Sequence, residues 1–358
     1  MRSSFLNLSL ACLLGITASA FCADTVTPIP LADGDAYRLS TTAERGALTV
    51  DLRNAVGQWI PLTRKGAEGG WYGYNQQAGT HGTEGVRPDV SRHHVAGQQV
   101  VTVTCSIADG VKHRADYFAR PGFCLVISEL QAATPPTDIG IVRLAPTFDL
   151  DISAFSCYAG RSARGILHTG TIASAVPRPG YFGVGPWSQE PGVRMDGFDP
   201  RRPYLAFFNP AGGPLVAFVY LRPDVFWRGG RHFLQVWDGA ANYLYTGMFD
   251  AGHFNTPVPF LVCARADGDL TAFEADLPRM IDEATSIART SGRLPSLEAE
   301  VQATSRLAAM APRSPSTPTA SGWLQAWRER YAYARATDAV AHADAPGALR
   351  VLSLLAKP

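Results

Sequence analysis

The chain has 358 residues, which is enough for one large β-domain or for two domains of ordinary size. Apolar residues make up 46% of the sequence and charged residues 18%, so a sizeable core can form and extensive disorder is excluded. The formal net charge is +1 and no basic block occurs, which leaves nucleic acid binding without electrostatic support.

Residues 1–20 have the pattern of a secretory signal. Arg2 is followed by an apolar run from Leu6 to Ile16 that is too short to span a bilayer, and Ala18-Ser19-Ala20 is a typical cleavage site. We therefore expect an exported protein, secreted or periplasmic. Lipoprotein anchoring through Cys22 is the less favoured alternative, because the residues before it make a poor lipobox.

Besides Cys22, the chain after residue 20 contains four cysteines, Cys105, Cys124, Cys157 and Cys263. Export permits disulfides, and four cysteines allow three pairings, which the spacing leaves open. None of the four has C-x-x-C spacing, so we expect no zinc site, and we expect no other metal or cofactor.

Short strands separated by Gly, Pro and Asp dominate the chain up to residue 268. Ala47–Leu52 alternates apolar and polar residues, and Gly57–Leu62 is its expected hairpin partner. Residues 65–92 lack this periodicity and have the profile of a long functional loop. The regular spacing of the later strands predicts an all-β fold, a large sandwich or supersandwich over residues 21–268. These strands are expected at Gln98–Ile107, Val111–Phe118, Phe123–Leu130, Ile139–Leu144, Gly165–Ser174, Tyr204–Phe208, Leu215–Leu221, Phe233–Trp237, Tyr243–Phe249 and Val258–Ala264.

The pattern becomes helical in the last part of the chain. Leu270–Ala288 has helical spacing, with Pro278 as a kink or as a junction between two helices. An aromatic stripe at Trp323, Trp327 and Tyr331 repeats every four residues and predicts another helix. We expect a helical segment packed on the sandwich (269–311), a Pro/Ser/Thr linker (312–321) and a C-terminal helical segment (322–358).

Several features occur in an order typical of one superfamily. They are the strand Thr256–Cys263, the acidic turn Ala266–Asp269, the helix that starts at Leu270 and, further upstream, the Tyr-Phe-x-Arg-Pro-Gly-Phe step at Tyr117–Phe123. Over residues 26–290 the chain resembles the β-supersandwich of the galactose-mutarotase-like superfamily, which occurs in mutarotases, polysaccharide lyases and the N-terminal part of several glycoside hydrolases. The resemblance implies a β-supersandwich and a role with carbohydrate. It covers only the accessory domain of those hydrolases, and the catalytic His and Glu of mutarotases cannot be mapped onto this chain.

Standard catalytic strings are absent from the sequence. It has no G-x-S-x-G, P-loop or H-E-x-x-H, no G-x-G-x-x-G after a strand, and Asp267 and Asp269 lack the further ligands of a calcium loop. The strongest signal is compositional, because Tyr181–Phe260 holds 18 of the 36 Phe, Tyr and Trp residues. Aromatic rings can stack on the apolar face of a sugar, and Arg, His and Asp among them can clamp a carboxylate or move a proton.

The candidate site therefore draws on residues 71–94, 186–203 and 227–253. The catalytic candidates are Asp196, His232, Asp238 and His253. The candidates for sugar binding are Trp71, Tyr72, Trp187, Arg201, Trp227, Arg231, Trp237 and Tyr243. The competing interpretation is structural, since aromatic rings can plug the end of a sandwich and charged loop residues can pair with each other.

A second possible cluster contains His81, His93 and His94 together with Glu84 and Asp89. Such a set could bind a metal or act as acid and base. His93 and His94 face opposite sides of an extended strand, however, which favours ordinary surface histidines.

We predict an exported carbohydrate-binding or carbohydrate-active protein. If it is catalytic, the expected reaction is lysis, hydrolysis or epimerisation of a poly- or oligosaccharide through side-chain acid–base chemistry. The alternative is a non-catalytic structural or assembly protein of the bacterial cell envelope, docked through its C-terminal helix. We expect no nucleic acid partner and no transmembrane segment.

Overall fold

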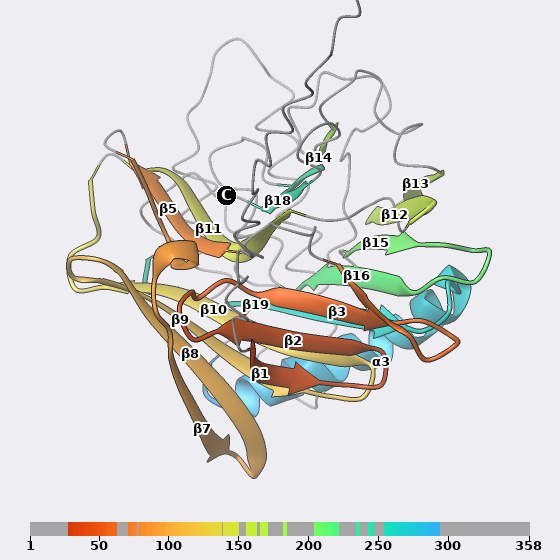
Figure 1. Cartoon of the computed structure of the whole chain (residues 1–358), viewed down its shortest axis with the longest axis horizontal. Coiled ribbons are helices and arrows are strands. Elements are labelled where there is room, and N and C mark those ends of the chain that lie inside the picture. Colours follow the sequence, from red (N-terminus) through yellow and green to blue (C-terminus); the bar gives the residue numbers. More distant parts are fainter. Residues whose placement is uncertain are drawn as a thin grey trace, which may run out of the picture.

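β-Strands make up most of the described chain, as the alternating sequence predicts. The computed structural model describes residues 28–62, 71–76, 79–137, 139–149, 155–162, 165–170, 182–184, 204–221, 234–236, 243–246 and 254–293. Within these residues the strands form three antiparallel sheets, and one α-helix follows them (Figure 1). The all-β prediction with a helix near its end is confirmed for this part of the chain. The predicted signal peptide, the linker and the C-terminal helical segment lie outside it.

The smallest described sheet has the order β1-β2-β3-β4. Its third and fourth strands form the hairpin expected from residues 47–62. Tyr37, Leu39, Val50 and Leu52 are buried on its inner side, because alternate residues of a strand point to one face. The strands are β1 (Pro28–Asp33), β2 (Tyr37–Thr42), β3 (Thr49–Arg53) and β4 (Trp59–Pro61).

The largest described sheet has nine strands in the order β13-β12-β15-β16-β19-β10-β9-β8-β7. Its strands are β7 (Asp89–Val95), β8 (Gln98–Ala108), β9 (Val111–Ala119), β10 (Phe123–Ala132), β12 (Cys157–Ser162), β13 (Gly165–Gly170), β15 (Tyr204–Phe208), β16 (Leu215–Tyr220) and β19 (Val258–Arg265). A six-stranded sheet has the order β14-β17-β18-β11-β5-β6. Its strands are β5 (Trp71–Gln76), β6 (Gly79–Gly82), β11 (Ile139–Asp149), β14 (Phe182–Val184), β17 (Leu234–Val236) and β18 (Tyr243–Thr246), and a short 3-10 helix η1 (Thr83–Gly85) follows β6.

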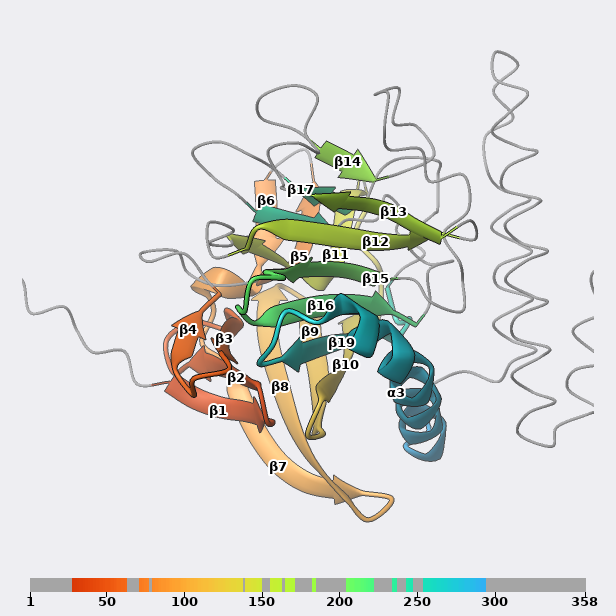
Figure 2. The same cartoon turned by 90° about the vertical axis from the view of Figure 1, so that its right-hand side faces the viewer.

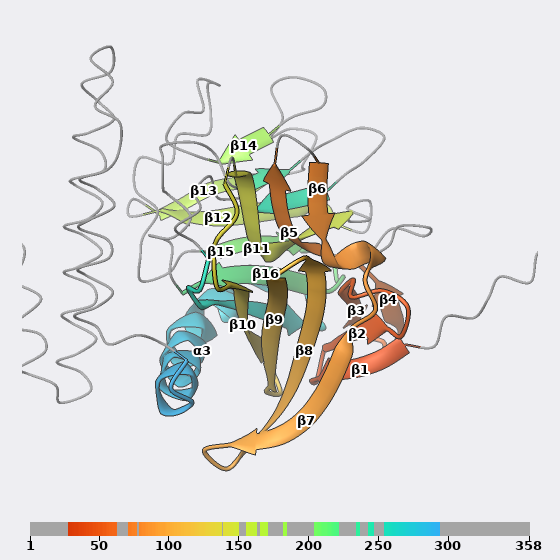
Figure 3. The ribbon, with the colours of Figure 1, turned by 90° about the vertical axis from the view of Figure 1, so that its left-hand side faces the viewer.

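The core lies on both faces of the nine-stranded sheet. Cys124 and Val126 of β10 belong to the apolar cluster on the side of the small sheet, whereas Phe123 and Leu125 belong to the cluster on the other side. The small sheet and the helix α3 (Leu270–Thr290) lie on opposite sides of these strands (Figures 2 and 3). Central strands covered on both faces explain why their sequences are continuous apolar runs.

The helix α3 is continuous, and Pro278 lies inside it rather than at a junction. The side chain of Asp269 caps its first turn by accepting a hydrogen bond from the backbone N–H of Ala272 at 2.9 Å. One face of the helix packs on the sheet, and each fully buried apolar side chain contributes at most about 1.5–3 kcal/mol. The buried residues are Phe273, Leu277, Met280, Ala284, Thr285, Ile287 and Ala288.

The prediction of one long loop over residues 65–92 is wrong where the structure describes it. β5, β6, η1 and the start of β7 occupy much of this stretch. Glycines concealed the β5–β6 hairpin, because Gly has little strand propensity. Gly73 is required there: its φ is 154°, and a Cβ would lie about 2.0 Å from the carbonyl oxygen of His81.

The four cysteines left open by the sequence are unpaired: Cys105, Cys124 and Cys263 are buried, and Cys157 is half-buried. Cys124 and Cys263 lie on adjacent strands but belong to the apolar clusters on opposite faces of the sheet. Burial raises the pKa of Cys105 to about 12 and also raises the pKa of Cys124 and of Cys263. These three thiols are therefore core groups rather than nucleophiles.

Among the described residues, no helix combines the length and the apolar character needed to cross a membrane.

Candidate functional site

The six-stranded sheet joins the sequence stretches in which site residues were predicted. β5 and β6 belong to the stretch 71–94, β17 and β18 belong to the stretch 227–253, and β14 ends just before the stretch 186–203. The central link is β11, which pairs with β5 on one side and with β18 on the other. Figure 3 shows β5, β6 and β11 together above β8, β9 and β10 of the nine-stranded sheet. Segments that are far apart in sequence are therefore neighbours in this sheet.

Trp71 and Tyr243 occupy nearby register positions on the two sides of β11. Trp71 pairs with Thr147, and Tyr243 pairs with Asp149. Paired residues share one face of a sheet, and the face alternates along a strand, so these four positions belong to the same face. Two predicted sugar-binding residues are thus brought to one face. Asp149 joins them there, although the sequence interpretation did not single it out.

Tyr72 differs from its prediction as a sugar-binding residue, because it lies in the core. Its side chain is 1% exposed and stacks on His113 with ring centroids 4.1 Å apart. Its hydroxyl lies 3.3 Å from the hydroxyl of Tyr117, and burial raises its pKa. Tyr74 is also buried and packs edge-on against Phe254. A ring enclosed in this way offers no face to a ligand from solvent.

The histidines of the second cluster are spread over different elements. His81 on β6 stacks on Tyr74 with centroids 4.9 Å apart. On β7, His93 is half-buried and His94 is exposed, and adjacent strand residues point to opposite faces. No group of three or more His, Cys, Asp or Glu side chains within the described ranges is placed to hold a metal ion. The cluster is therefore not assembled in this part of the chain.

The remaining predicted site residues lie outside the described residues. They are the catalytic candidates Asp196, His232, Asp238 and His253 and the sugar-binding candidates Trp187, Arg201, Trp227, Arg231 and Trp237.

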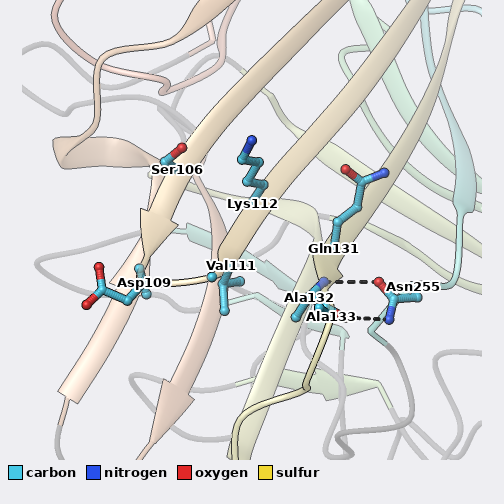
Figure 4. A pocket seen from close by; sticks show the side chains of 10 residues that line it. Ser106, Asp109, Val111, Lys112, Gln131, Ala132, Ala133 and Asn255 are labelled. Carbon is cyan, nitrogen blue, oxygen red and sulfur yellow. Dashed lines mark hydrogen bonds between the residues drawn. The ribbon is translucent and has the colours of Figure 1, made fainter.

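A depression of about 660 Å³ lies at the end of the β8–β9 hairpin, beside the end of β10 (Figure 4). Ser106, Lys112 and Gln131 line it from three adjacent strands. Asn255 forms its edge and is fixed to β10: its amide oxygen accepts from the backbone N–H of Ala132 at 3.0 Å, and its amide nitrogen donates to the carbonyl of Ala132 at 2.8 Å. The segment that follows His253 in sequence is therefore held in place.

The lining of this depression suits polar ligands but not glycoside hydrolysis. Among the lining residues Asp109 is the single carboxylate, Lys112 is the single cation, and none is aromatic. Hydrolysis of a glycosidic bond requires a pair of carboxyl groups. The depression therefore lacks by itself the groups that this reaction needs.

A charged cluster that the sequence interpretation missed lies on the α3 side of the sheet. Asp116 is 2% exposed and accepts hydrogen bonds from Thr102 Oγ1 at 2.6 Å and from Arg114 Nε at 3.1 Å. Arg293, just beyond α3, lies 3.0 Å from Asp116 and donates to Glu129 at 3.1 Å. The cluster ties the end of α3 to β9 and β10. Its signal in the sequence is the pair of charged residues Arg114 and Asp116 among the largely buried residues of β9.

The sequence matches no family model and no curated protein at a significant level. Solved structures similar to this chain include the alpha-N-acetylgalactosaminidase NagBb from Bifidobacterium bifidum in complex with GalNAc, with 15% identity, coverage of 77% of this chain and 41% of that chain, and a TM-score of 0.47. They also include the GH36 alpha-galactosidase AgaB from Geobacillus stearothermophilus, with 10% identity, coverage of 68% and 40%, and a TM-score of 0.40. A GalM/aldose epimerase homologue from C. elegans has 12% identity, coverage of 67% and 99%, and a TM-score of 0.36.

This chain spans about two fifths of the length of the two glycosidases.

Proposed function

We propose that this chain is an exported protein that binds or acts on a poly- or oligosaccharide. Its sugar-contact surface would be the face of the six-stranded sheet that carries positions 71 and 243. The observation that supports this proposal is the pairing of β11 with both β5 and β18, which brings an aromatic residue from each to one face. The signal-like residues 1–20 support export.

The spacing of the two aromatic positions suits a chain of sugars rather than a single ring. Trp71 and Tyr243 lie two strand spacings apart across β11 and two residues apart along it. Standard sheet dimensions convert this into a Cα separation of roughly 12 Å. One sugar ring is narrower than this separation. An oligosaccharide that runs obliquely over β11 could contact both positions.

Asp149 is the acidic position nearest to this pair in register. It stands opposite Tyr243, and it belongs to the same face as Trp71. A carboxylate beside a Tyr is a reasonable pair for proton transfer to or from a sugar hydroxyl or glycosidic oxygen. If the protein is an enzyme, Asp149 would act together with one or more of Asp196, His232, Asp238 and His253.

The experiment is a glycan panel on residues 21–358, read by calorimetry for binding and by chromatography for products. Trp71→Ala and Tyr243→Ala should each weaken binding about tenfold, because each removes a stacking face. Val56→Ala is the control for these two positions, since Val56 is 84% exposed in the β3–β4 turn of the small sheet. Asp149→Asn should leave binding in place and abolish any product.

Three results would contradict the proposal. Binding that survives both aromatic substitutions would place the sugar elsewhere. Products formed equally well by Asp149→Asn would remove Asp149 from the chemistry. An absence of both binding and products across the panel would favour the envelope-assembly alternative.

A further inference from the structure

A second depression, of about 430 Å³, lies where the small sheet meets the turn between β9 and β10. Its lining differs in kind from that of the depression near Asn255, because it contains an indole in addition to charged groups of both signs. The charged and aromatic residues of the lining are Asp33, Asp35, Arg38, Arg53, Trp59 and Arg120.

One wall of this pocket is rigid. Tyr37 is fully buried, and its hydroxyl lies 2.7 Å from the carbonyl oxygen of Arg120 and 2.6 Å from that of Phe123. The backbone N–H of Asp35 donates to the carbonyl of Pro121 at 2.8 Å. These bonds fix the β9–β10 turn against the corner between β1 and β2. A pocket bounded by fixed backbone is already shaped before a ligand arrives.

Arg120 belongs to this wall and is not available to a ligand. Its guanidinium donates to Glu283 at 2.9 Å, to Gln98 at 2.6 Å and to the carbonyl of Ala119 at 2.7 Å. Its charge is balanced by Glu283, so Arg120 adds shape to the pocket rather than a binding group.

The outer face of the small sheet supplies the groups that remain. The guanidinium carbon of Arg38 lies 3.8 Å from the ring centroid of Trp59. Arg38 also pairs with Asp33 at 3.6 Å, with side chains 50% and 66% exposed. A cation–π contact at an exposed site contributes only about 0.5–1 kcal/mol. Arg38 can therefore leave the indole and stay with Asp33 at small cost.

Arg53 and Asp35 are the uncommitted charges of the pocket. Arg53 is the register partner of Trp59, so the two residues share a face of the sheet. In the part of the chain that the structure describes, neither the Arg53 guanidinium nor the Asp35 carboxylate has a hydrogen bond or an ion pair. When Arg38 pairs only with Asp33, the pocket offers the Arg53 guanidinium as a hydrogen-bond donor and the Asp35 carboxylate as an acceptor. It also offers the aromatic face of Trp59.

This combination selects a neutral ligand that is rich in hydroxyl groups. With Arg38 and Asp33 paired, a carboxylate ligand would be repelled by Asp35 and a cation would be repelled by Arg53. Hydroxyl groups both donate and accept, so one ring can satisfy Asp35 and Arg53 together. The apolar face of a pyranose matches an indole.

We propose that this pocket binds a neutral sugar residue, stacked on Trp59 and hydrogen-bonded to Asp35 and Arg53. The inference rests on the proposed role with carbohydrate and adds a second contact site to it. Two sites on one chain raise the affinity for a long glycan without new contacts at either site, because the second binding event becomes intramolecular.

The test is calorimetric titration of residues 21–358 with cellohexaose, maltohexaose and xylohexaose, with oligogalacturonate and free amino acids as contrasting ligands. Trp59→Ala and Arg53→Ala should each weaken binding of the neutral oligosaccharide about tenfold. Trp59→Phe should recover part of the loss because it restores an aromatic face. Arg38→Ala should bind at least as tightly as the parent, since it uncovers the indole.

Arg87→Ala is the matched control, because Arg87 is an exposed arginine outside the pocket. Thermal unfolding of each variant separates loss of binding from loss of fold. Unchanged binding in both Trp59→Ala and Arg53→Ala would refute the pocket, as would binding confined to oligogalacturonate or to amino acids. Loss of affinity on Arg38→Ala would refute the displacement of Arg38.

The same titrations separate this inference from the proposed function. Loss caused only by Trp71→Ala and Tyr243→Ala refutes the pocket and leaves the sheet surface in place. Loss caused only by Trp59→Ala and Arg53→Ala supports the pocket and refutes the sheet surface. No binding of any neutral oligosaccharide refutes both.

Discussion

His113 makes the stability of this protein depend on pH in a defined window. Its ring is 1% exposed, stacks on Tyr72, and has its Nε2 atom 2.9 Å from Ser128 Oγ. Its Nδ1 atom has no hydrogen-bond partner in the described structure. Burial lowers the pKa of His113 from 6.5 to about 3, because the cation loses its hydration. The histidine is therefore neutral in the folded protein at ordinary pH.

Because folding lowers the pKa of His113, the protein loses stability as the pH falls. The unfolded chain regains a pKa near 6.5, so between pH 6.5 and 3 unfolding takes up one proton at this residue. The stabilisation is fully present above pH 6.5 and decreases as the pH falls toward 3. The slope of the unfolding free energy approaches roughly 1.4 kcal/mol per pH unit from this group alone.

Urea unfolding at pH 7, 6 and 5 measures this slope, and His113→Gln supplies the comparison. Glutamine can still bond to Ser128 but does not titrate, while every other ionisable group is common to both proteins. Between pH 6 and 5 the parent should lose about 1 kcal/mol more than the variant. Equal losses in the two proteins would show that His113 is protonated in the folded state and would refute the reasoning.

Two pairs of substitutions test the contacts that hold the helix and the small sheet in place. Asp116→Ala should lower the unfolding free energy by about 1–3 kcal/mol, because Thr102 loses its buried acceptor while Arg293 keeps Glu129 as a partner, and denaturant titration measures the loss. Arg293→Ala should lower the unfolding free energy by a similar or smaller amount. If neither substitution changed it, the cluster would not contribute to the stability of the fold. Tyr37→Phe should cost about 1–3 kcal/mol, since the backbone groups at Arg120 lose a buried partner. Tyr72→Phe, which loses a single 3.3 Å contact, should cost less, and the reverse order would contradict this account.

Local sequence signals were sufficient for the strands that form hairpins with their neighbours in sequence. The turns Asp109-Gly110 and Pro121-Gly122 separate three stretches rich in apolar residues, and the structure has β8, β9 and β10 there with ends close to those expected. Gly110 adopts a φ of 69°, the conformation for which glycine is favoured in such a turn. Each of these elements is specified within about ten residues of sequence, so the local apolar pattern and the turn chemistry are enough.

The order of strands in the six-stranded sheet could not be predicted from local sequence signals. β11 pairs with β5, which precedes it, and with β18, which follows it after a long stretch of chain. Nothing in the alternation of one strand specifies a distant partner, because many strands present similar edges. The sequence could therefore nominate Trp71 and Tyr243 separately, from their residue type, but it could not show that they share a sheet. For the same reason Asp149 carried no signal until its register was known.

The alternation of β5 decides which of its aromatic residues can serve a site. The side chains of Tyr72 and Tyr74 are both buried, so the even-numbered positions of this strand face the core. Trp71 has the other parity and belongs to the opposite face, together with Thr147 and Asp149. A sequence interpretation based on composition treats Trp71 and Tyr72 alike, since both are aromatic residues in a glycine-rich stretch. Once the strand exists, at most one of two adjacent aromatic residues can face the core, and the burial of Tyr72 is itself the reason that Trp71 remains a candidate.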